Sequence, residues 1–180
     1  MVKDFLKELE KGDLQQETER LLLKCIERLV LSDDLKDAME QVLEAILGFY
    51  AADRAYVFEF DWDEGCMSNR FEVCRTGVEP EWEHLQNVSI ALIAPWIDEF
   101  YAHGKRVYMI GDVEELKADP TRLREYEYLC RQGIRSLMTL PIYCGGLLYG
   151  FVGVDNPRRK LDRPVVLEHC TYVASNELHK

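Results

Sequence analysis

The stretch LPIYCGGLLYGFVGVDNP, residues 140–157, constrains the fold most because two apolar runs flank the pair Gly145-Gly146. Two adjacent glycines between such runs favour a two-residue hairpin turn, which requires positive φ at its central residues. A phosphate-binding loop would need a helix after the glycines, since helix N–H groups hold the anion. A second apolar run follows instead, so the stretch predicts two strands joined by a tight turn. Gly150 and Gly153 inside the second strand indicate a bulge or the close approach of another group.

Length and charge narrow the class of protein. The chain has 180 residues, 47% of them hydrophobic, which suits one domain with a true core and an added helix. Its formal net charge of −11 argues against binding to nucleic acid or to anionic lipid. The N-terminus is charged and no apolar run is long enough to span a bilayer. We therefore expect a cytoplasmic segment that contacts neither a membrane nor nucleic acid.

Cysteine and histidine spacing gives no sign of a metal site. The six cysteines include no C-x-x-C pair, and the four histidines are scattered without ligand spacing. We interpret most of the cysteines as reduced core residues and expect no metal.

Periodicity predicts helices at both ends and strands between them. Ser32 or Asp33 can cap a second helix over residues 33–50. In a strand over 54–62, Tyr56, Phe58, Phe60 and Trp62 alternate on one face. The remaining elements are helices over 3–31, 95–104, 120–132 and from 162 onward, a turn at 113–117, and strands at 68–76, 87–93, 106–110, 134–143 and 147–154. A mostly antiparallel sheet between helices, an α+β fold, is the simplest packing.

Several of these segments together resemble a GAF domain. The segments are ADRAYVFEFD after an amphipathic helix, GIRSLMTLPIYCGGLLYGFVGVDNP, and a closing helix, and they span residues 33–178. The resemblance implies a PAS-related α+β fold with five or six antiparallel strands, helices on both faces and a small-molecule pocket. Residues 1–31 would then be an N-terminal signalling and dimerisation helix, and residues 32–180 the GAF domain. GFVGVDNP looks most like GAF modules of bacterial signalling proteins, which commonly precede diguanylate cyclase or similar output domains.

The resemblance also allows tests of ligand class. Bilin-binding members attach the chromophore to a cysteine, often followed by histidine, ahead of the strand proline. Counting back from Pro141 places Arg124 and Glu125 there, so we expect no covalent bilin. Members that bind cyclic nucleotides carry a Phe and an acidic pair after this strand, whereas here only Asn156 of that pattern is present. The ligand therefore stays unknown.

A thiol enzyme is the alternative from another class. The family includes free methionine sulfoxide reductase, and Cys130 stands at the position of its reactive cysteine. The aspartate beside that cysteine and the resolving cysteine upstream are missing from this chain. Cys130-dependent catalysis is therefore the second hypothesis.

The family places a ligand between the sheet and residues 82–132. Aromatic residues would supply its walls and a few polar groups its anchors. The candidate ligand-binding residues are Trp82, Trp96, Tyr101, Asp112, Tyr126, Tyr128, Arg70, Arg135 and Ser136. The alternative interpretation is that aromatic residues such as Trp96, Tyr101 and Tyr126 simply cover the sheet.

We therefore expect a sensory module that is not itself catalytic. It would form a homodimer through its terminal helices, bind a small molecule, and control a linked output domain, with cyclic-di-GMP synthesis as the expected output. A third hypothesis is a dimerisation module without a ligand. The last helix has no stop signal, which suggests that an output domain follows.

Overall fold

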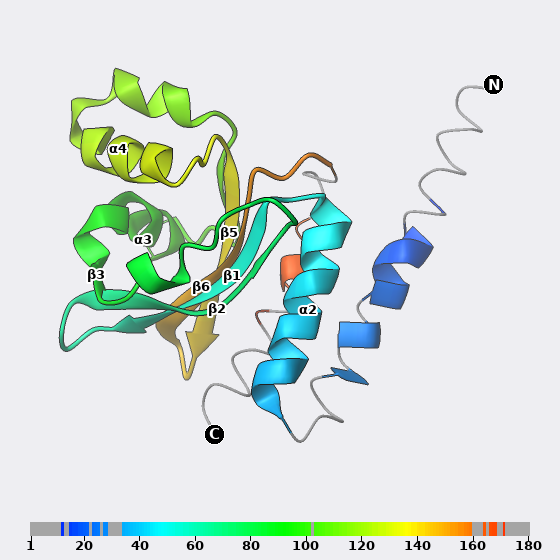
Figure 1. Ribbon diagram of the computed structural model, residues 1–180. Coiled ribbons are helices and arrows are strands. Elements are labelled where there is room, and N and C mark those ends of the chain that lie inside the picture. The colour runs from blue at the N-terminus through cyan, green and yellow to red at the C-terminus, as the bar shows by residue number, and fades with distance from the viewer. Residues whose placement is uncertain are drawn as a thin grey trace.

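A six-stranded antiparallel sheet forms the centre of the molecule, with the strand order β3-β2-β1-β6-β5-β4 (Figure 1). The computed structural model describes residues 12, 15–21, 23–25, 27–28, 34–101, 103–159, 164, 166–168 and 171. The strands are β1 (Arg54–Asp61), β2 (Cys66–Cys74), β3 (Val88–Ser89), β4 (Tyr108–Ile110), β5 (Leu137–Cys144) and β6 (Leu147–Asp155). The predicted α+β class with helices on both faces of an antiparallel sheet is confirmed.

Helix α2 (Leu35–Tyr50) covers one face of the sheet. Its N-cap is Asp34, whose carboxylate accepts hydrogen bonds from the N–H groups of Lys36 at 2.9 Å and Asp37 at 3.3 Å. The sequence prediction of Ser32 or Asp33 as the cap was therefore wrong. The cap is the last residue of the SDD triplet, which directly precedes the first helical residue, so that its side chain reaches the second and third N–H groups of the helix.

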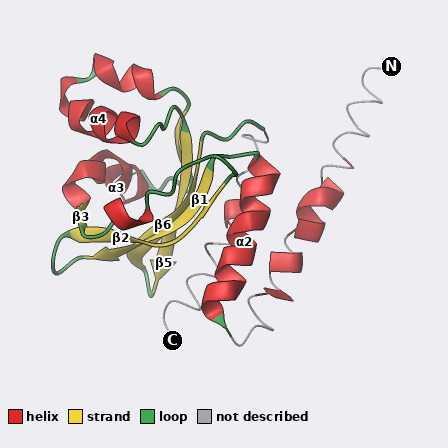
Figure 2. Ribbon diagram, in the orientation of Figure 1, coloured by secondary structure: helices red, strands yellow, loops and turns green. Residues whose placement is uncertain are grey.

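The other face carries shorter helices, as Figure 2 shows. They are the 3₁₀ helices η1 (Trp82–His84), η2 (Ile90–Ile93), η3 (Val113–Ala118) and η4 (Pro120–Arg122), and the α-helices α3 (Ala94–Tyr101) and α4 (Leu123–Arg131). The prediction of a strand over 87–93 was wrong for most of its length, because only Val88 and Ser89 pair with β2. A 3₁₀ turn begins at Ile90 and places Ile90 and Ile93, three residues apart, on the same buried side.

The β5–β6 hairpin agrees with its sequence prediction. Gly145 and Gly146 form the turn with φ of 58° and 83°. The register of β5 and β6 shifts beside Gly150, where an added Cβ would lie 1.9 Å from the backbone oxygen of Phe58. At Gly153 an added Cβ would lie 2.5 Å from the ring of Tyr56. Both close approaches that the two glycines indicated are therefore present.

The sheet separates two cores. We call the side covered by α2 the α2 face; its buried side chains are mainly aliphatic and include Ile46, Leu140 and Val152. We call the opposite side the cavity face; it is rich in aromatic residues, among them Phe58 and Phe151.

Parts of the predicted terminal helices lie outside the described residues. Where the structure describes the segment 12–28, it is helical; Leu21 and Cys25 pack on the core of the α2 face, and this helix lies beside α2 (Figure 1). Val166 and Leu167, from the predicted last helix, are buried in the same core. None of the helices seen in the described part of the chain has the length and apolar character needed to cross a bilayer.

Candidate ligand site

A cavity of about 30 Å³ lies on the cavity face, between the sheet and the helical layer that contains η2, α3 and α4. It is lined by Tyr56, Phe58, Met67, Glu72, Leu85, Ile93, Trp96, Tyr128, Leu129, Gln132, Ile134, Phe151 and Asp155. A buried water needs roughly 10–15 Å³ of such space. The cavity therefore has room for about two waters or a group of similar size.

Asp155 is the most deeply buried acidic group of the cavity, with an exposed fraction of 2%. One carboxylate oxygen accepts a hydrogen bond from the hydroxyl of Tyr56 at 2.8 Å, and the other lies 3.6 Å from Nη1 of Arg54. The Tyr56 ring reaches Asp155 by lying over Gly153, which faces it across the β1–β6 ladder. The side chain of Asp155 thus reaches the cavity because a glycine leaves space for its partner.

The ionisation of Asp155 is unusual for a carboxyl group. Burial raises its pKa to about 7, although the Tyr56 hydroxyl and Arg54 both favour the ionised form. Burial and the neighbouring Asp155 raise the pKa of Tyr56 well above its ordinary value. The Tyr56 hydroxyl therefore stays protonated and donates a hydrogen bond to Asp155. Asp155 can therefore change its charge near neutral pH.

Arg54 is buried beside the cavity, and three of its five N–H groups donate to backbone oxygens. Nε and Nη2 donate to the backbone oxygen of Glu79 at 3.2 and 3.0 Å, and Nη1 donates to the backbone oxygen of Gln132 at 3.0 Å. Arg54 thus joins the loop before η1 to the end of α4. It offsets part of the negative charge of Asp155 but makes no short hydrogen bond to it.

Two further polar groups border the cavity. The carboxylate of Glu72 accepts hydrogen bonds from Nδ2 of Asn69 at 3.2 Å and from the backbone N–H groups of Glu81 at 2.9 Å and Trp82 at 3.1 Å. The Tyr128 hydroxyl is buried and makes no hydrogen bond of standard geometry within the described residues. A buried hydroxyl without a partner is costly, which makes Tyr128 the polar group most in need of a ligand or a water.

Trp96 is held by a network behind the cavity. Its Nε1–H donates to Glu125 at 2.6 Å, and Glu125 also accepts two hydrogen bonds from Arg122 at 2.7 and 2.8 Å. Arg122 donates in turn to the hydroxyl of Tyr108, whose ring stacks on Trp96 at 5.4 Å. The network fixes the indole from α4 and β4, so the position of this wall depends on several elements.

The residue after Asp155 anchors the end of β6. Asn156 has a φ of 50°, accepts hydrogen bonds from the backbone N–H groups of Arg135 and Ser136, and donates to Asp53 at 2.9 Å. Burial works against ionisation of Asp53, but hydrogen bonds from Arg158, Asn156 and Arg75 keep the pKa of Asp53 below its ordinary value. The two adjacent residues thus have different structural roles: Asp155 lines the cavity, and Asn156 holds the end of β6 in place.

The structure brings two of the nine predicted site residues, Trp96 and Tyr128, to the cavity. Trp82 is 47% exposed and its backbone N–H binds Glu72. Tyr101 is 50% exposed, and its hydroxyl accepts the N–H of Leu148. Tyr126 donates its hydroxyl proton to Glu114 on η3.

The remaining predicted residues make contacts elsewhere. Arg70 is paired with Glu59 at 2.8 Å, and Asp112 caps η3 by accepting the N–H of Glu114. Arg135 is exposed, while Ser136 is half-buried, and each binds Asn156 through its backbone N–H. None of these four residues lines the cavity.

Sequence reasoning missed Asp155, Tyr56 and Glu72 as site residues. A usable signal was present for the first two: Tyr56 alternates with Phe58, and Phe151, Gly153 and Asp155 share one face of β6 by their spacing of two. Glu72 follows a register shift in β2, which sequence periodicity does not reveal.

The cysteines are less buried than predicted. Cys25 is buried, Cys66, Cys74 and Cys144 are half-buried, and Cys130 is exposed; all five are free thiols. The prediction that most cysteines are core residues was therefore wrong for the described ones. Cys130 lies on α4 but does not line the cavity. Within the described ranges, no three His, Cys, Asp or Glu side chains gather in a way that could hold a metal ion.

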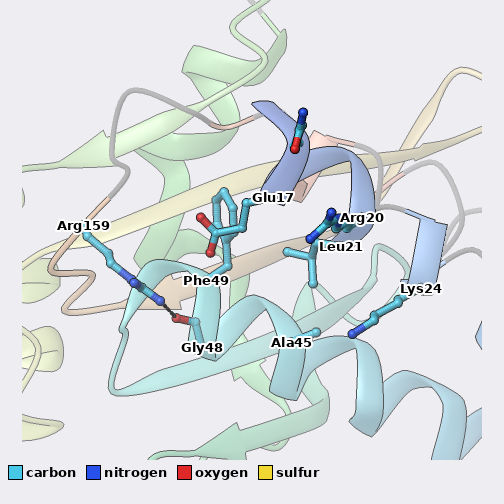
Figure 3. A pocket seen from close by; sticks show the side chains of 9 residues that line it. Glu17, Arg20, Leu21, Lys24, Ala45, Gly48, Phe49 and Arg159 are labelled. Atoms are coloured by element: carbon cyan, nitrogen blue, oxygen red, sulfur yellow. Dashed lines mark hydrogen bonds between the residues drawn. The ribbon is translucent and has the colours of Figure 1, made fainter. Parts of the chain in front are cut away.

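A larger hollow of about 550 Å³ lies on the other side of the sheet, between the N-terminal helical residues and α2 (Figure 3). Its charged side chains, Glu17, Arg20, Lys24 and Arg159, are all exposed. Arg159 donates to the backbone oxygen of Gly48 at 2.6 Å, which Figure 3 shows at one end. Exposed charges attract a charged ligand only weakly, because water and salt screen them. The cavity on the cavity face is therefore the stronger candidate ligand site.

Comparison with known proteins agrees with this architecture. The GAF domain family matches residues 34–171. The methanogenesis regulatory histidine kinase FilI of Methanothrix harundinacea (strain 6Ac) is 32% identical over 136 residues; the match covers 73% of this chain but 15% of that protein.

Solved structures share the fold at lower identity. The phycocyanobilin-bound GAF domain of a cyanobacterial phytochrome has a TM-score of 0.72 and 20% identity, covering 89% of this chain and 93% of that one. The chromophore-binding domain of the bacteriophytochrome RpBphP3 from R. palustris has a TM-score of 0.70 and 17% identity, covering 92% and 61%. The chain belongs to the GAF domain family.

Proposed function

We propose that the chain is the sensory module of a signalling protein, which binds a small molecule in the internal cavity and is not itself catalytic. The observation that carries this proposal is a buried carboxyl group, Asp155, in one cavity with the buried hydroxyl of Tyr128, which makes no hydrogen bond to any residue that the structure describes. Polar groups at such positions cost stability. A role in binding gives a reason for their presence.

Strand β6 offers a route from the cavity to the α2 face. Phe151 and Asp155 point to the cavity, while Val152 and Val154, between them, pack in the core with α2. A ligand that displaces β6 would therefore change the packing of α2, and through α2 that of the N-terminal helical residues. Closely packed cores pass on such shifts because they do not deform continuously.

The same helices would form a homodimer in this proposal. Leu23 is 61% exposed on the N-terminal helical segment, on the side of the sheet where α2 lies. In this dimer the terminal helices of the two chains would pack in parallel, and they could pass a rotation or a shift to the next domain. The output domain would be a histidine kinase or a diguanylate cyclase. The identity to FilI supports the kinase, and the form of the GFVGVDNP segment supports the cyclase.

Light scattering tests the dimer. We expect wild-type protein at twice the mass of the chain, and Leu23→Glu at the mass of one chain. Leu147→Glu is the matched control, because Leu147 is 71% exposed on the β5–β6 hairpin and belongs to neither terminal helix. A wild-type monomer, or a dimer that Leu147→Glu disrupts and Leu23→Glu does not, contradicts this part of the proposal.

A thermal-shift screen of nucleotides, amino acids and tetrapyrroles tests ligand binding. A bound compound stabilises the folded state by mass action. We expect a compound that raises the melting temperature of wild-type protein and loses its effect in Tyr128→Phe. A complete lack of response across the screen favours the ligand-free dimerisation module. Turnover of free methionine sulfoxide that Cys130→Ser abolishes would favour the thiol enzyme instead.

A further inference from the structure

The charge and size of the cavity restrict its ligand. Of the ionisable side chains around it, Asp155 and Glu72 are acidic, and Arg54 is the basic one that faces Asp155. Three of the five N–H groups of Arg54 donate to backbone oxygens of Glu79 and Gln132, and its guanidinium also lies 3.6 Å from Asp155 and 3.9 Å from Glu81. An anionic ligand would meet two carboxyl groups and one guanidinium, which already faces Asp155. A cation would meet a net negative site.

Aromatic side chains supply the rest of the environment. Five of them line the cavity: Tyr56, Phe58, Trp96, Tyr128 and Phe151. Their rings pack closely, with Phe58 stacked on Phe151 at 4.8 Å and Trp96 edge-on to Phe151 at 5.6 Å. Aromatic rings attract a cation within about 6 Å of their centroids, and the attraction increases where water is excluded. A carboxylate inside an aromatic enclosure is the chemistry that recognises an organic ammonium group.

The volume sets the size of that group. About 30 Å³ accommodates two or three heavy atoms, and a larger body needs the half-buried residues Glu72, Tyr128 and Gln132 to move outward. We propose that the cavity binds a compact organic cation of the methylammonium class, with the Asp155 carboxylate as its counter-ion and the Tyr128 hydroxyl as a hydrogen-bond acceptor. This inference rests on the proposed function of the cavity, and it names the ligand class of that site.

Ionisation gives the proposal a pH signature. The groups facing Asp155 are Arg54 and Tyr56 from β1, Glu72 from β2 and Tyr128 from α4. With the pKa of Asp155 raised to about 7, the counter-ion forms as the pH rises through neutrality. Affinity for a methylammonium ion therefore increases between pH 6 and pH 8, and binding at pH 6 releases protons to the buffer.

Calorimetric titration of the full chain at constant ionic strength tests the inference. The probes are methylammonium and dimethylammonium chloride, methanol and acetone as neutral compounds, and sodium formate and acetate as anions. We expect the ammonium ions alone to bind, Asp155→Asn to weaken them by about tenfold or more, and Tyr128→Phe to weaken them less. Asp98→Asn, an exposed change of the same kind on α3, is the matched control and leaves affinity unchanged.

The other outcomes separate the two proposals. If methanol, acetone or an anion binds in a manner sensitive to Tyr128→Phe and the ammonium ions do not, the cavity is a ligand site and the cation assignment is wrong. If ammonium ions bind equally to wild type and Asp155→Asn, the counter-ion role is wrong. If no ammonium ion binds at any pH, the inference is overturned, while the proposed sensory function still depends on the broader screen and on the dimer.

Discussion

The two faces of the sheet bury different chemistry. The six strands contribute four buried polar or charged residues, and all four lie on the cavity face with the aromatic residues: Arg54, Asn69, Thr139 and Asp155. The α2 face contributes aliphatic residues from the same strands, such as Val57, Leu140 and Val152. An apolar face needs only shape to be stable, whereas buried polar groups need partners. The difference shows which side stabilises the fold and which side can recognise a ligand.

We expect the largest loss of stability from a change to alanine at a buried leucine, and the two faces of the sheet should differ in its size. Leu43 on α2 is fully buried, and its change to Ala should lower the free energy of unfolding by about 2–5 kcal/mol. Leu85→Ala on the cavity side should cost at least about 1 kcal/mol less, because Leu85 already borders an empty space and loses fewer contacts. Urea unfolding measures both. Equal losses of unfolding free energy, or a larger loss for Leu85→Ala, would show that the cavity side is packed as tightly around Leu85 as the α2 face is around Leu43.

The next prediction compares two glycines, one on β6 and one in α2. An added Cβ at Gly153 meets the Tyr56 ring at 2.5 Å and Thr139 Cγ2 at 2.8 Å, so Gly153→Ala should cost about 1–3 kcal/mol. Gly48→Ala is the control, because Gly48 lies in α2 with open space around it. There Ala should stabilise by about 0.5–1 kcal/mol. Thermal unfolding that shows no difference between the two variants would contradict the close packing of Tyr56 over β6.

A pH dependence should come from the cavity side. Asp155 holds its proton more tightly in the folded chain, with a pKa of about 7, than in the unfolded chain. Its contribution to stability is therefore present below the unfolded pKa, near 4, and is lost as the pH rises to about 7.

The matched measurement is the difference in unfolding free energy between wild type and Asp155→Asn at pH 4.5 and at pH 7.5. Wild type should lose stability relative to the variant by at least about 1 kcal/mol, given that one pKa unit is about 1.4 kcal/mol. A constant difference across this range would show that Asp155 is ionised throughout in the folded state.

The smallest expected effect is at the N-cap of α2. Asp34→Ala removes the acceptor for the N–H groups of Lys36 and Asp37, and should cost about 0.5–2 kcal/mol. Circular dichroism during urea unfolding measures the loss, and Asp34→Asn should restore most of it, because asparagine is a good N-cap. If Asp34→Asn is as unstable as Asp34→Ala, the capping role is wrong.

The sequence was sufficient for elements that rest on local rules. The β5–β6 turn follows from Gly145-Gly146, and the strand face from the alternation of Tyr56, Phe58 and Phe60, so both could be predicted. Trp62, the last residue of the predicted alternation, lies beyond the end of β1 and is 47% exposed. Trp96 and Tyr128 could be assigned to the cavity only through the family resemblance.

The other site residues depend on contacts between distant segments. Asp155 receives its partner from β1 across Gly153, and Glu72 receives the N–H groups of residues 81 and 82 from a loop. Residues such as Tyr101 and Arg70 have the right chemistry but bind elsewhere, since register and side-chain direction decide which pairs meet. Local pattern does not contain that information.

The indole N–H signals of ¹⁵N-labelled protein can show whether a small cation enters the cavity. The chain has three tryptophans: Trp96 lines the cavity, while Trp62 and Trp82 are each 47% exposed outside it. On titration with methylammonium chloride at pH 8, we expect the Trp96 signal to shift in a saturable way and the Trp62 signal to stay fixed. A fixed Trp96 signal, or an equal shift at Trp62, would contradict the cavity as the site of methylammonium binding.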